Sequence, residues 1–227
     1  PVLDIWSNPD NTVIGNRAYG KTSDDVCKYG IADMLGLKAT GAIPVAKHFP
    51  GHGDIETDSH YGLPLVTKTK EELWQSELLP FKSAIENGVP MIMAAHILCT
   101  ELDENYPASM SKNIITDLLR DEMGFEGVVI TDDLTMGAIS ESYSFGDAAV
   151  LSINAGCDIL SICFGKDNVK QAVKAIKEAV ENGAITEERI DESVRRILKL
   201  KEDYNVTSEV VEMPDIDELN SKTAKFQ

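Results

Sequence analysis

Three of the four histidines in this chain, His48, His52 and His60, lie in one short segment, KHFPGHGDIETDSH, at residues 47–60. Asp58 precedes His60 by two residues. A carboxylate beside an imidazole orients the ring, fixes its tautomer and stabilises its protonated form, as general acid/base catalysis requires. The two glycines of the segment allow sharp turns, so we expect a loop that can move. The segment therefore predicts a catalytic loop that brings the His60 imidazole to a substrate.

The same segment could instead bind a metal ion. Nitrogen and oxygen ligands of the kind that zinc accepts are available from His48, His52, Asp54, Asp58 and His60. However, no HExxH or similarly diagnostic spacing is present. A metal-dependent hydrolase therefore stays one alternative, and a polar loop without catalytic function is another. Acid/base catalysis by this loop would require no cofactor.

A second group of carboxylates follows the apolar run GVVIT at residues 127–131, where Asp132 and Asp133 end a predicted strand. A carboxylate at the tip of a strand is rigidly held and suits a nucleophile or an electrostatic stabiliser. One of the two is expected to cap the following turn, and the residues alone do not say which. Asp4 and His96 also stand near the ends of predicted strands, where we expect each to hold neighbouring loops through hydrogen bonds.

Five short apolar runs rich in β-branched residues predict the strands that carry these groups. They lie at residues 2–5, 43–46, 89–97, 127–131 and 158–163. The clearest helix is predicted over 69–87, where Thr69 and Glu72 can form a capping box and Pro80 is expected to kink or divide the helix. Further helices are predicted over 111–123, over 169–180 and after a cap at Thr186.

Strands that alternate with helices predict an α/β fold with a parallel sheet covered on both faces. The sheet can be open and doubly wound, or part of an eight-stranded barrel, which typically needs about 250 residues. The strands begin roughly 39 residues apart, so three further units would take roughly 120 residues, and the chain begins directly in a strand. We therefore expect the later part of a barrel over residues 1–205. The acidic stretch 206–227 is predicted to be a linker or arm leading to a second domain, or a disordered tail.

The composition is that of a folded, acidic protein. Among 227 residues, 21 Lys and Arg stand against 38 Asp and Glu, so the formal net charge is −17. This charge argues against nucleic acid or an anionic lipid surface as a partner, and no apolar run approaches the length of a membrane span. Cys99, Cys157 and Cys163 lie in apolar runs and are predicted to be buried, reduced thiols, which favours a cytoplasmic location.

The segment at residues 47–60 closely resembles the signature of the bacterial β-N-acetylglucosaminidases of glycoside hydrolase family 3. The resemblance extends over most of the chain and leaves out only the C-terminal tail. Its other matching stretches are PVLDI at 1–5, VIGNRAYG at 13–20, MAAHI at 93–97, GFEGVVITDDLTMGAI at 124–139, AGCDIL at 155–160 and ITEERIDESVRRILKLK at 185–201.

This resemblance implies a TIM-type (β/α)8 barrel, of which the chain holds strands 4 to 8 with their helices. It also implies a retaining mechanism through a covalent glycosyl-enzyme intermediate. By motif position, Asp132 would be the nucleophile, and His60 paired with Asp58 would be the acid/base. The positions that hold the sugar hydroxyls in the family are matched by Arg17, Lys47 and His48.

The resemblance also implies a substrate class. The β-glucosidase branches of the family lack the Asp-x-His loop, so the loop indicates N-acetylglucosaminides, such as cell-wall muropeptides or short amino-sugar oligomers. The family's first three strands, with an Asp-rich segment that contacts the sugar, have no counterpart in this sequence, so we expect a missing N-terminal segment to complete the site. Phosphorolysis instead of hydrolysis, and an inactive sugar-binding fragment, are the alternatives within this interpretation.

Overall fold

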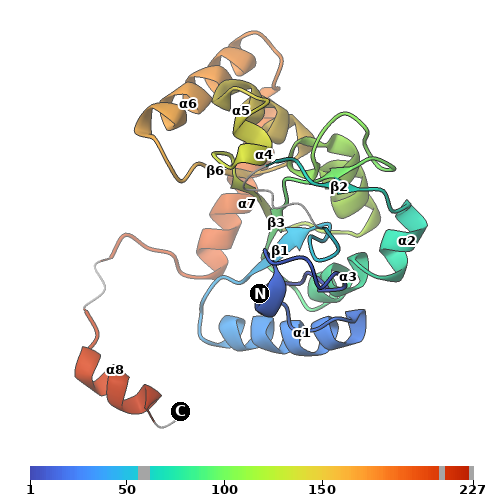
Figure 1. Cartoon of the computed structure of the whole chain (residues 1–227). Helices are drawn as coiled ribbons and strands as arrows, with labels where there is room; N and C mark the ends of the chain where they lie inside the picture. The colour runs from blue at the N-terminus through green and yellow to red at the C-terminus, as the bar shows by residue number, and fades with distance from the viewer. Residues whose placement is uncertain (56–61, 210–212, 225–227) are drawn as a thin grey trace.

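The computed structural model describes residues 1–55, 62–209 and 213–224, and Figure 1 shows helices around a small central sheet. The sheet is parallel and contains, in this order, β1 (Val45–Phe49), β3 (Met91–Ala94), β5 (Val128–Asp133) and β6 (Ile159–Ser161). Val2 pairs in parallel with Lys47 on the other edge of β1. A second, smaller sheet pairs β2 (Leu65–Val66) with β4 (Leu98–Cys99).

The order of the strands decides between the two architectures that the sequence allowed. Strands follow one another across the sheet in the order in which they occur along the chain. A doubly wound sheet reverses its order at a switch point, whereas consecutive units of a (β/α)8 barrel do not. The sheet is therefore a run of consecutive barrel units, and the prediction of an α/β barrel fold is confirmed.

Helices connect and cover the strands. Those that pack around the sheet are α1 (Ser23–Ala39), α2 (Lys70–Gln75), α3 (Leu78–Glu86), α5 (Phe145–Ala155), α6 (Lys166–Glu181) and α7 (Glu187–Asp203), with a π-type helix, η3 (Asn113–Glu122), before β5. Three short helices are η1 (Gly15–Arg17), η2 (Ala108–Met110) and α4 (Gly137–Ser140), and α8 (Ile216–Thr223) lies near the C-terminal end of the described residues. In the described part of the chain, no helix combines the length and the apolar character needed to cross a bilayer.

The helix predicted over 69–87 forms with its capping box. Thr69 Oγ1 accepts the N–H of Glu72, and the Glu72 carboxylate accepts the N–H of Thr69. The helix divides into α2 and α3, but the break comes before α3 rather than at Pro80. Pro80 lies in the first turn of α3, where its missing N–H leaves no helical hydrogen bond unmade.

The strand predicted over residues 2–5 is wrong in extent, because only Val2 joins the sheet. The next N–H along β1, that of His48, donates to the carboxylate of Asp4 at 3.2 Å instead of to backbone, so the ladder ends there. Conversely, β1 continues beyond its predicted end at residue 46. Lys47 and His48 are therefore strand residues, with the fixed positions that a strand gives.

The prediction of buried cysteines holds for two of three residues. Cys99 and Cys157 are buried, and burial raises the pKa of each thiol to about 12. Cys163 is exposed, so its prediction is wrong: the residue lies just beyond the end of β6, where the apolar run has left the sheet. All four cysteines are free thiols.

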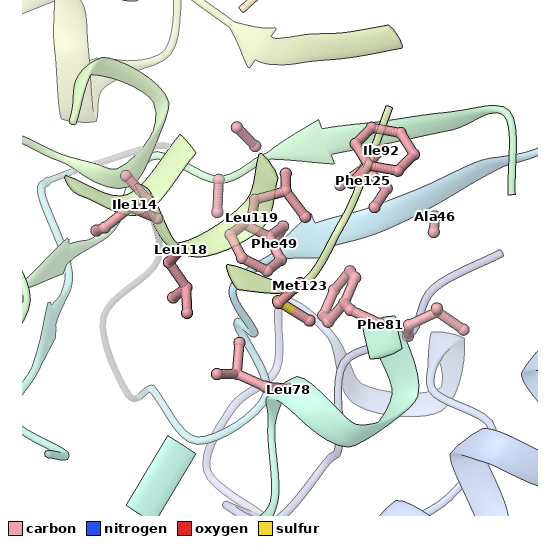
Figure 2. Packing of buried hydrophobic residues seen from close by; sticks show 14 of the residues in the cluster. Ala46, Phe49, Leu78, Phe81, Ile92, Ile114, Leu118, Leu119, Met123 and Phe125 are labelled. Carbon is pink, nitrogen blue, oxygen red and sulfur yellow. The ribbon is translucent and has the colours of Figure 1, made fainter. Parts of the chain in front are cut away.

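The main core fixes β1 against the helices that cover it. Phe49 of β1 and Phe81 of α3 pack edge to face, with ring centroids 5.3 Å apart. Figure 2 shows these two rings gathered with Leu119 and Met123, which come from η3 and the residue after it. Edge-to-face aromatic pairs favour one relative orientation, so this contact helps to hold the carboxyl end of β1 in place.

A buried charge cluster fixes the last strand. Asp158 directly precedes β6, and its side chain is fully buried. Arg120 Nη2 from η3 lies 2.7 Å from Asp158 Oδ2, while Arg196 Nη1 and Arg189 Nη2 from α7 lie 3.1 Å and 3.5 Å from Oδ1. The N–H of Val129 in β5 also donates to Oδ2, at 3.0 Å. One carboxylate thus joins two helices to two strands.

Candidate active site

A small cavity of about 130 Å³ opens at the carboxyl ends of the strands. Its lining consists of Val13, Ile14, Arg17, Lys47, His48, His52, Asp132 and Met136. Four of the six residues predicted from sequence to form the site are therefore together: Arg17, Lys47, His48 and Asp132. The other two, Asp58 and His60, lie outside the described residues.

Asp4 organises the histidine side of the cavity. Its carboxylate is fully buried, accepts the N–H of His52 at 2.7 Å and that of His48 at 3.2 Å, and lies 2.7 Å from His48 Nδ1. Burial alone would raise the pKa of Asp4, but the neighbouring charges and hydrogen bonds of His48 and His52 outweigh it and lower that pKa. Because a carboxylate only accepts, His48 Nδ1 carries the proton of this contact. The expectation that Asp4 holds neighbouring loops is confirmed.

Asp132 and Asp133 have different environments, although they are adjacent. The Asp133 carboxylate accepts the N–H of Thr135 at 3.0 Å, its hydroxyl at 2.5 Å and the N–H of Cys163 at 2.9 Å. Burial opposes ionisation of Asp133, but these hydrogen bonds prevail and lower its pKa. Asp133 is therefore the residue that caps the turn after β5, and Asp132 is the one whose side chain lines the cavity.

His96 holds the end of β5 through a hydrogen bond to its last residue. Nε2 donates to the backbone oxygen of Asp133 at 3.1 Å, so Nδ1 accepts from the hydroxyl of Ser109 at 2.8 Å. Burial lowers the pKa of His96, although the carboxylates of Asp132 and Asp133 oppose this shift. The imidazole is thus neutral and has a structural role, in agreement with the expectation that His96 holds its neighbours by hydrogen bonds.

The cationic side of the cavity comes from two different elements. Arg17 lies in η1, and its Nε and Nη2 both donate to the backbone oxygen of Val13, at 3.0 Å and 2.8 Å. Lys47 extends from β1, opposite Val2. Guanidinium and ammonium groups donate hydrogen bonds to hydroxyl oxygens, and with one carboxylate they make a cavity suited to a polar, hydroxyl-rich ligand.

Sequence reasoning missed three cavity residues and reached a fourth only as a metal ligand. Val13, Ile14 and Met136 lie in stretches that match the family signature, but apolar residues carry no chemical signal of their own. His52 is buried, and burial lowers its pKa although Asp4 opposes the shift. Its backbone oxygen accepts Asn11 Nδ2–H at 2.7 Å.

Three of the five candidate ligands of the alternative metal site, His48, His52 and Asp54, belong to the described residues. Within residues 1–55, 62–209 and 213–224, no group of three or more His, Cys, Asp or Glu side chains is placed to hold a metal ion. Asp54, one of the candidate ligands, lies 2.6 Å from Lys68 Nζ and accepts from the Ser7 hydroxyl. The other two, Asp58 and His60, lie outside the described residues.

Comparison with known proteins places the chain in a family. The Glycosyl hydrolase family 3 N terminal domain matches residues 1–200. Beta-hexosaminidase A of Pseudoalteromonas piscicida is 37% identical over 219 residues, which cover 88% of this chain and 37% of that protein. The beta-hexosaminidase of Methylococcus capsulatus is 37% identical over 182 residues, which cover 80% of this chain and 53% of the relative.

A solved structure gives the same result. The glycoside hydrolase family 3 beta-N-acetylglucosaminidase from Paenibacillus superposes with a TM-score of 0.92 at 43% identity, over 95% of this chain and 41% of that one. The chain thus spans about half or less of the length of these relatives. Both the sequence and the fold match those of the family over nearly all of the chain's length. The chain belongs to glycosyl hydrolase family 3, within the N-terminal domain of that family.

Proposed function

We propose that this chain carries the reactive groups of a retaining β-N-acetylglucosaminidase. The observation that supports this best is that the two carboxylates at the end of β5 have different roles. Asp133 accepts hydrogen bonds from Thr135 and Cys163, whereas Asp132 lines a cavity with Arg17, Lys47 and His48. The relatives are named beta-hexosaminidases and a beta-N-acetylglucosaminidase, which supports the same reaction.

In the first step the Asp132 carboxylate attacks the anomeric carbon of the terminal sugar. The bond between that carbon and the leaving oxygen breaks, and the His60 imidazolium gives its proton to this oxygen. Asp58 orients the imidazole and stabilises its charged form. In the second step neutral His60 takes a proton from water, the water oxygen attacks the anomeric carbon, and Asp132 is released with net retention.

The other cavity residues bind and orient the sugar. Arg17, Lys47 and His48 donate hydrogen bonds to its hydroxyl groups, and Asp4 keeps the His48 ring in one orientation. A β-linked N-acetylglucosaminide from cell-wall muropeptides or short amino-sugar oligomers is the proposed substrate. Residues 206–227 are proposed to lead away from the catalytic part as a linker or arm.

The test is the release of nitrophenol from nitrophenyl N-acetylglucosaminide, compared with the matching glucoside, in the presence of EDTA. We expect selective turnover of the N-acetylglucosaminide, loss of turnover in Asp132→Asn, and measurable turnover in Asp133→Asn. A 5-fluoro N-acetylglucosaminyl fluoride should add one sugar mass to Asp132. Inhibition by EDTA would favour the metal-dependent alternative, a phosphate-dependent rate would favour phosphorolysis, and label on another residue would refute Asp132 as nucleophile.

A further inference from the structure

The lining of the cavity comes mainly from two separate stretches of the chain. One is the turn at residues 13–17, which ends in η1, and the other is β1 with the loop after it, at residues 47–52. The turn contains no strand, so the hydrogen bonds of the sheet do not hold it against β1. The separation of the proposed sugar-binding groups Arg17 and His48 therefore depends on whatever joins the two stretches.

Asn11 joins them through both polar atoms of its side-chain amide. Nδ2 donates to the backbone oxygen of His52 at 2.7 Å, and Oδ1 accepts the N–H of Ile14 at 2.9 Å. A backbone oxygen only accepts and a backbone N–H only donates, so these two partners fix which way the amide faces. Asn11 is only 1% exposed, so both hydrogen bonds are sheltered from water.

The peptide group between Val13 and Ile14 carries this contact on to Arg17. Its N–H donates to Asn11 Oδ1, and its oxygen accepts Arg17 Nε and Nη2 at 3.0 Å and 2.8 Å. The N–H and the C=O of a planar trans peptide point in opposite directions, so the bond to Asn11 also sets the direction of the oxygen. That oxygen receives two donors of one guanidinium. Asn11 thus orients Arg17 through a single peptide group.

His52 carries the contact in the other direction, toward His48. While the His52 oxygen accepts from Asn11, its N–H donates to Asp4 Oδ1 at 2.7 Å. Asp4 Oδ2 in turn lies 2.7 Å from His48 Nδ1. A continuous series of hydrogen bonds therefore connects Arg17 to His48, and Asn11 is the member of the series that spans the two stretches.

The main chain of Asn11 is fixed as well. Trp6 Nε1 donates to its backbone oxygen at 3.1 Å, and the N–H of Gly15 donates to the same oxygen at 3.2 Å. The ammonium of Lys21 lies over the Trp6 ring, 4.8 Å from its centroid. Because the backbone is held in this way, the side chain of Asn11 has a fixed base from which to set the distance between the two stretches.

We propose that Asn11 is a positioning residue that holds the Arg17 guanidinium at the distance from His48 at which both groups bind one sugar. This inference rests on the proposed function, in which Arg17 and His48 donate to the hydroxyl groups. Asn11 acts mainly through Arg17, because His48 keeps its own contact with Asp4 whatever residue stands at position 11.

The experiment measures the Kd of N-acetylglucosamine for the full chain by NMR titration, in a double-mutant cycle of Asn11→Asp and Arg17→Ala. Asn11→Asp keeps the size of the side chain and still accepts from Ile14, but it places an acceptor against the His52 oxygen. We expect this substitution to raise Kd by about tenfold in the parent chain. In the Arg17→Ala chain it should raise Kd by less than about threefold, because the group that Asn11 positions is gone.

Two further variants keep the test decisive. Asn154→Asp makes the same substitution at an exposed amide whose Nδ2 donates to the Ala184 oxygen at 3.2 Å, and it should leave Kd unchanged. If Asn11→Asp does not fold, Asn11→Ser offers one polar atom in place of two. The hydroxyl can accept from Ile14, as serine does in such turns, but no longer spans to His52. Its effect on Kd should depend on Arg17 in the same way.

The outcomes separate this inference from the proposed function. An unchanged Kd in Asn11→Asp, or the same increase with and without Arg17, would overturn the positioning role and leave the sugar site standing. A parent chain that does not bind N-acetylglucosamine, or an Arg17→Ala chain that binds it as tightly as the parent, would overturn both the proposed sugar contacts and the role of Asn11.

Discussion

Asp4 is the carboxylate on which the orientation of His48 depends. Asp4→Asn keeps the size of the side chain but removes the charge that faces His48 Nδ1 and two backbone N–H groups. We expect KM for the N-acetylglucosaminide to rise by about tenfold, because a hydrogen bond to a charged group contributes about 1.5 kcal/mol. Steady-state kinetics measure this change, with Asp10→Asn at an exposed turn as control. An unchanged KM would contradict binding through an oriented His48.

His96 gives the folded protein a definite pH dependence. Burial lowers the pKa of His96 in the folded state, against the opposing charges of Asp132 and Asp133. In the unfolded chain the pKa of a histidine is about 6.5. The contribution of His96 to stability is therefore complete above pH ~6.5 and is lost as the pH falls through the lower folded value. As the pH is lowered from 7.5 to ~5, the urea concentration at the unfolding midpoint should decrease, and it should decrease less steeply in His96→Gln. An identical slope in both proteins would assign the pH dependence to other groups.

These residues also show where prediction from sequence stops. Side chains alternate along a strand, so it is predictable that Asp132 and Asp133 face opposite ways, but not which of them faces the cavity. That depends on Thr135 and Cys163, and Cys163 lies thirty positions further along the chain than Asp133. The roles of Arg17 and Lys47 were accessible only through resemblance, because an isolated cation in a sequence has no pattern.

Gly53 marks the place where two backbone segments touch. An added Cβ would lie 1.9 Å from Ile5 O, and neither backbone can move without displacing the chain next to Asp4. We expect Gly53→Ala to lower stability by about 2 kcal/mol, or the melting temperature by about 6 °C. Gly36→Ala in α1 is the matched control: no atom lies within 4 Å, and Ala favours a helix over Gly by about 0.5–1 kcal/mol. Thermal unfolding of the two variants should therefore move in opposite directions, and a shared direction contradicts the contact.

The Asp158 cluster predicts a large effect far from the cavity. Asp158→Asn leaves Arg120, Arg189 and Arg196 without their shared charge at a fully buried position, which should cost about 3 kcal/mol. Asp167→Asn removes one partner of an exposed pair with Lys170 and should have no measurable effect. Urea unfolding at pH 7 measures both, and equal midpoints for the two variants would show that the arginines do not depend on Asp158.

Elements with a local signal were predictable, and those shaped by distant contacts were not. The capping box at Thr69 and the cap at Thr186 lie within one turn of their helices, and both are present. Helix α1 was not predictable from a hydrophobic pattern, because its buried face includes Gly30, which fits closely against Leu3. The extent of β1 depends on pairing with Val2 and β3, which no short window of sequence contains.

The net charge of −17 should make stability depend on salt. Like charges repel one another more strongly in the compact state, and raising ionic strength from about 0.01 M to about 0.15 M shortens the screening length from about 30 Å to about 8 Å. We expect the melting temperature to rise over this range. Exposed ion pairs such as Lys174–Glu178 act in the opposite direction but contribute little. A fall in melting temperature with sodium chloride would show that ion pairs outweigh the repulsion.

The order of the strands has a consequence for synthesis on the ribosome. In the four-stranded sheet each strand lies beside the strand of that sheet made before it, so its partner has already left the ribosome when it emerges; among the described strands only β2 emerges without an earlier partner, because it pairs with β4. Arg17, Lys47 and His48 all leave the ribosome by the time β1 is complete, whereas Asp132 follows on the third strand of the sheet. A nascent chain arrested between β3 and β5 therefore contains the residues proposed to bind the sugar but not yet the proposed nucleophile.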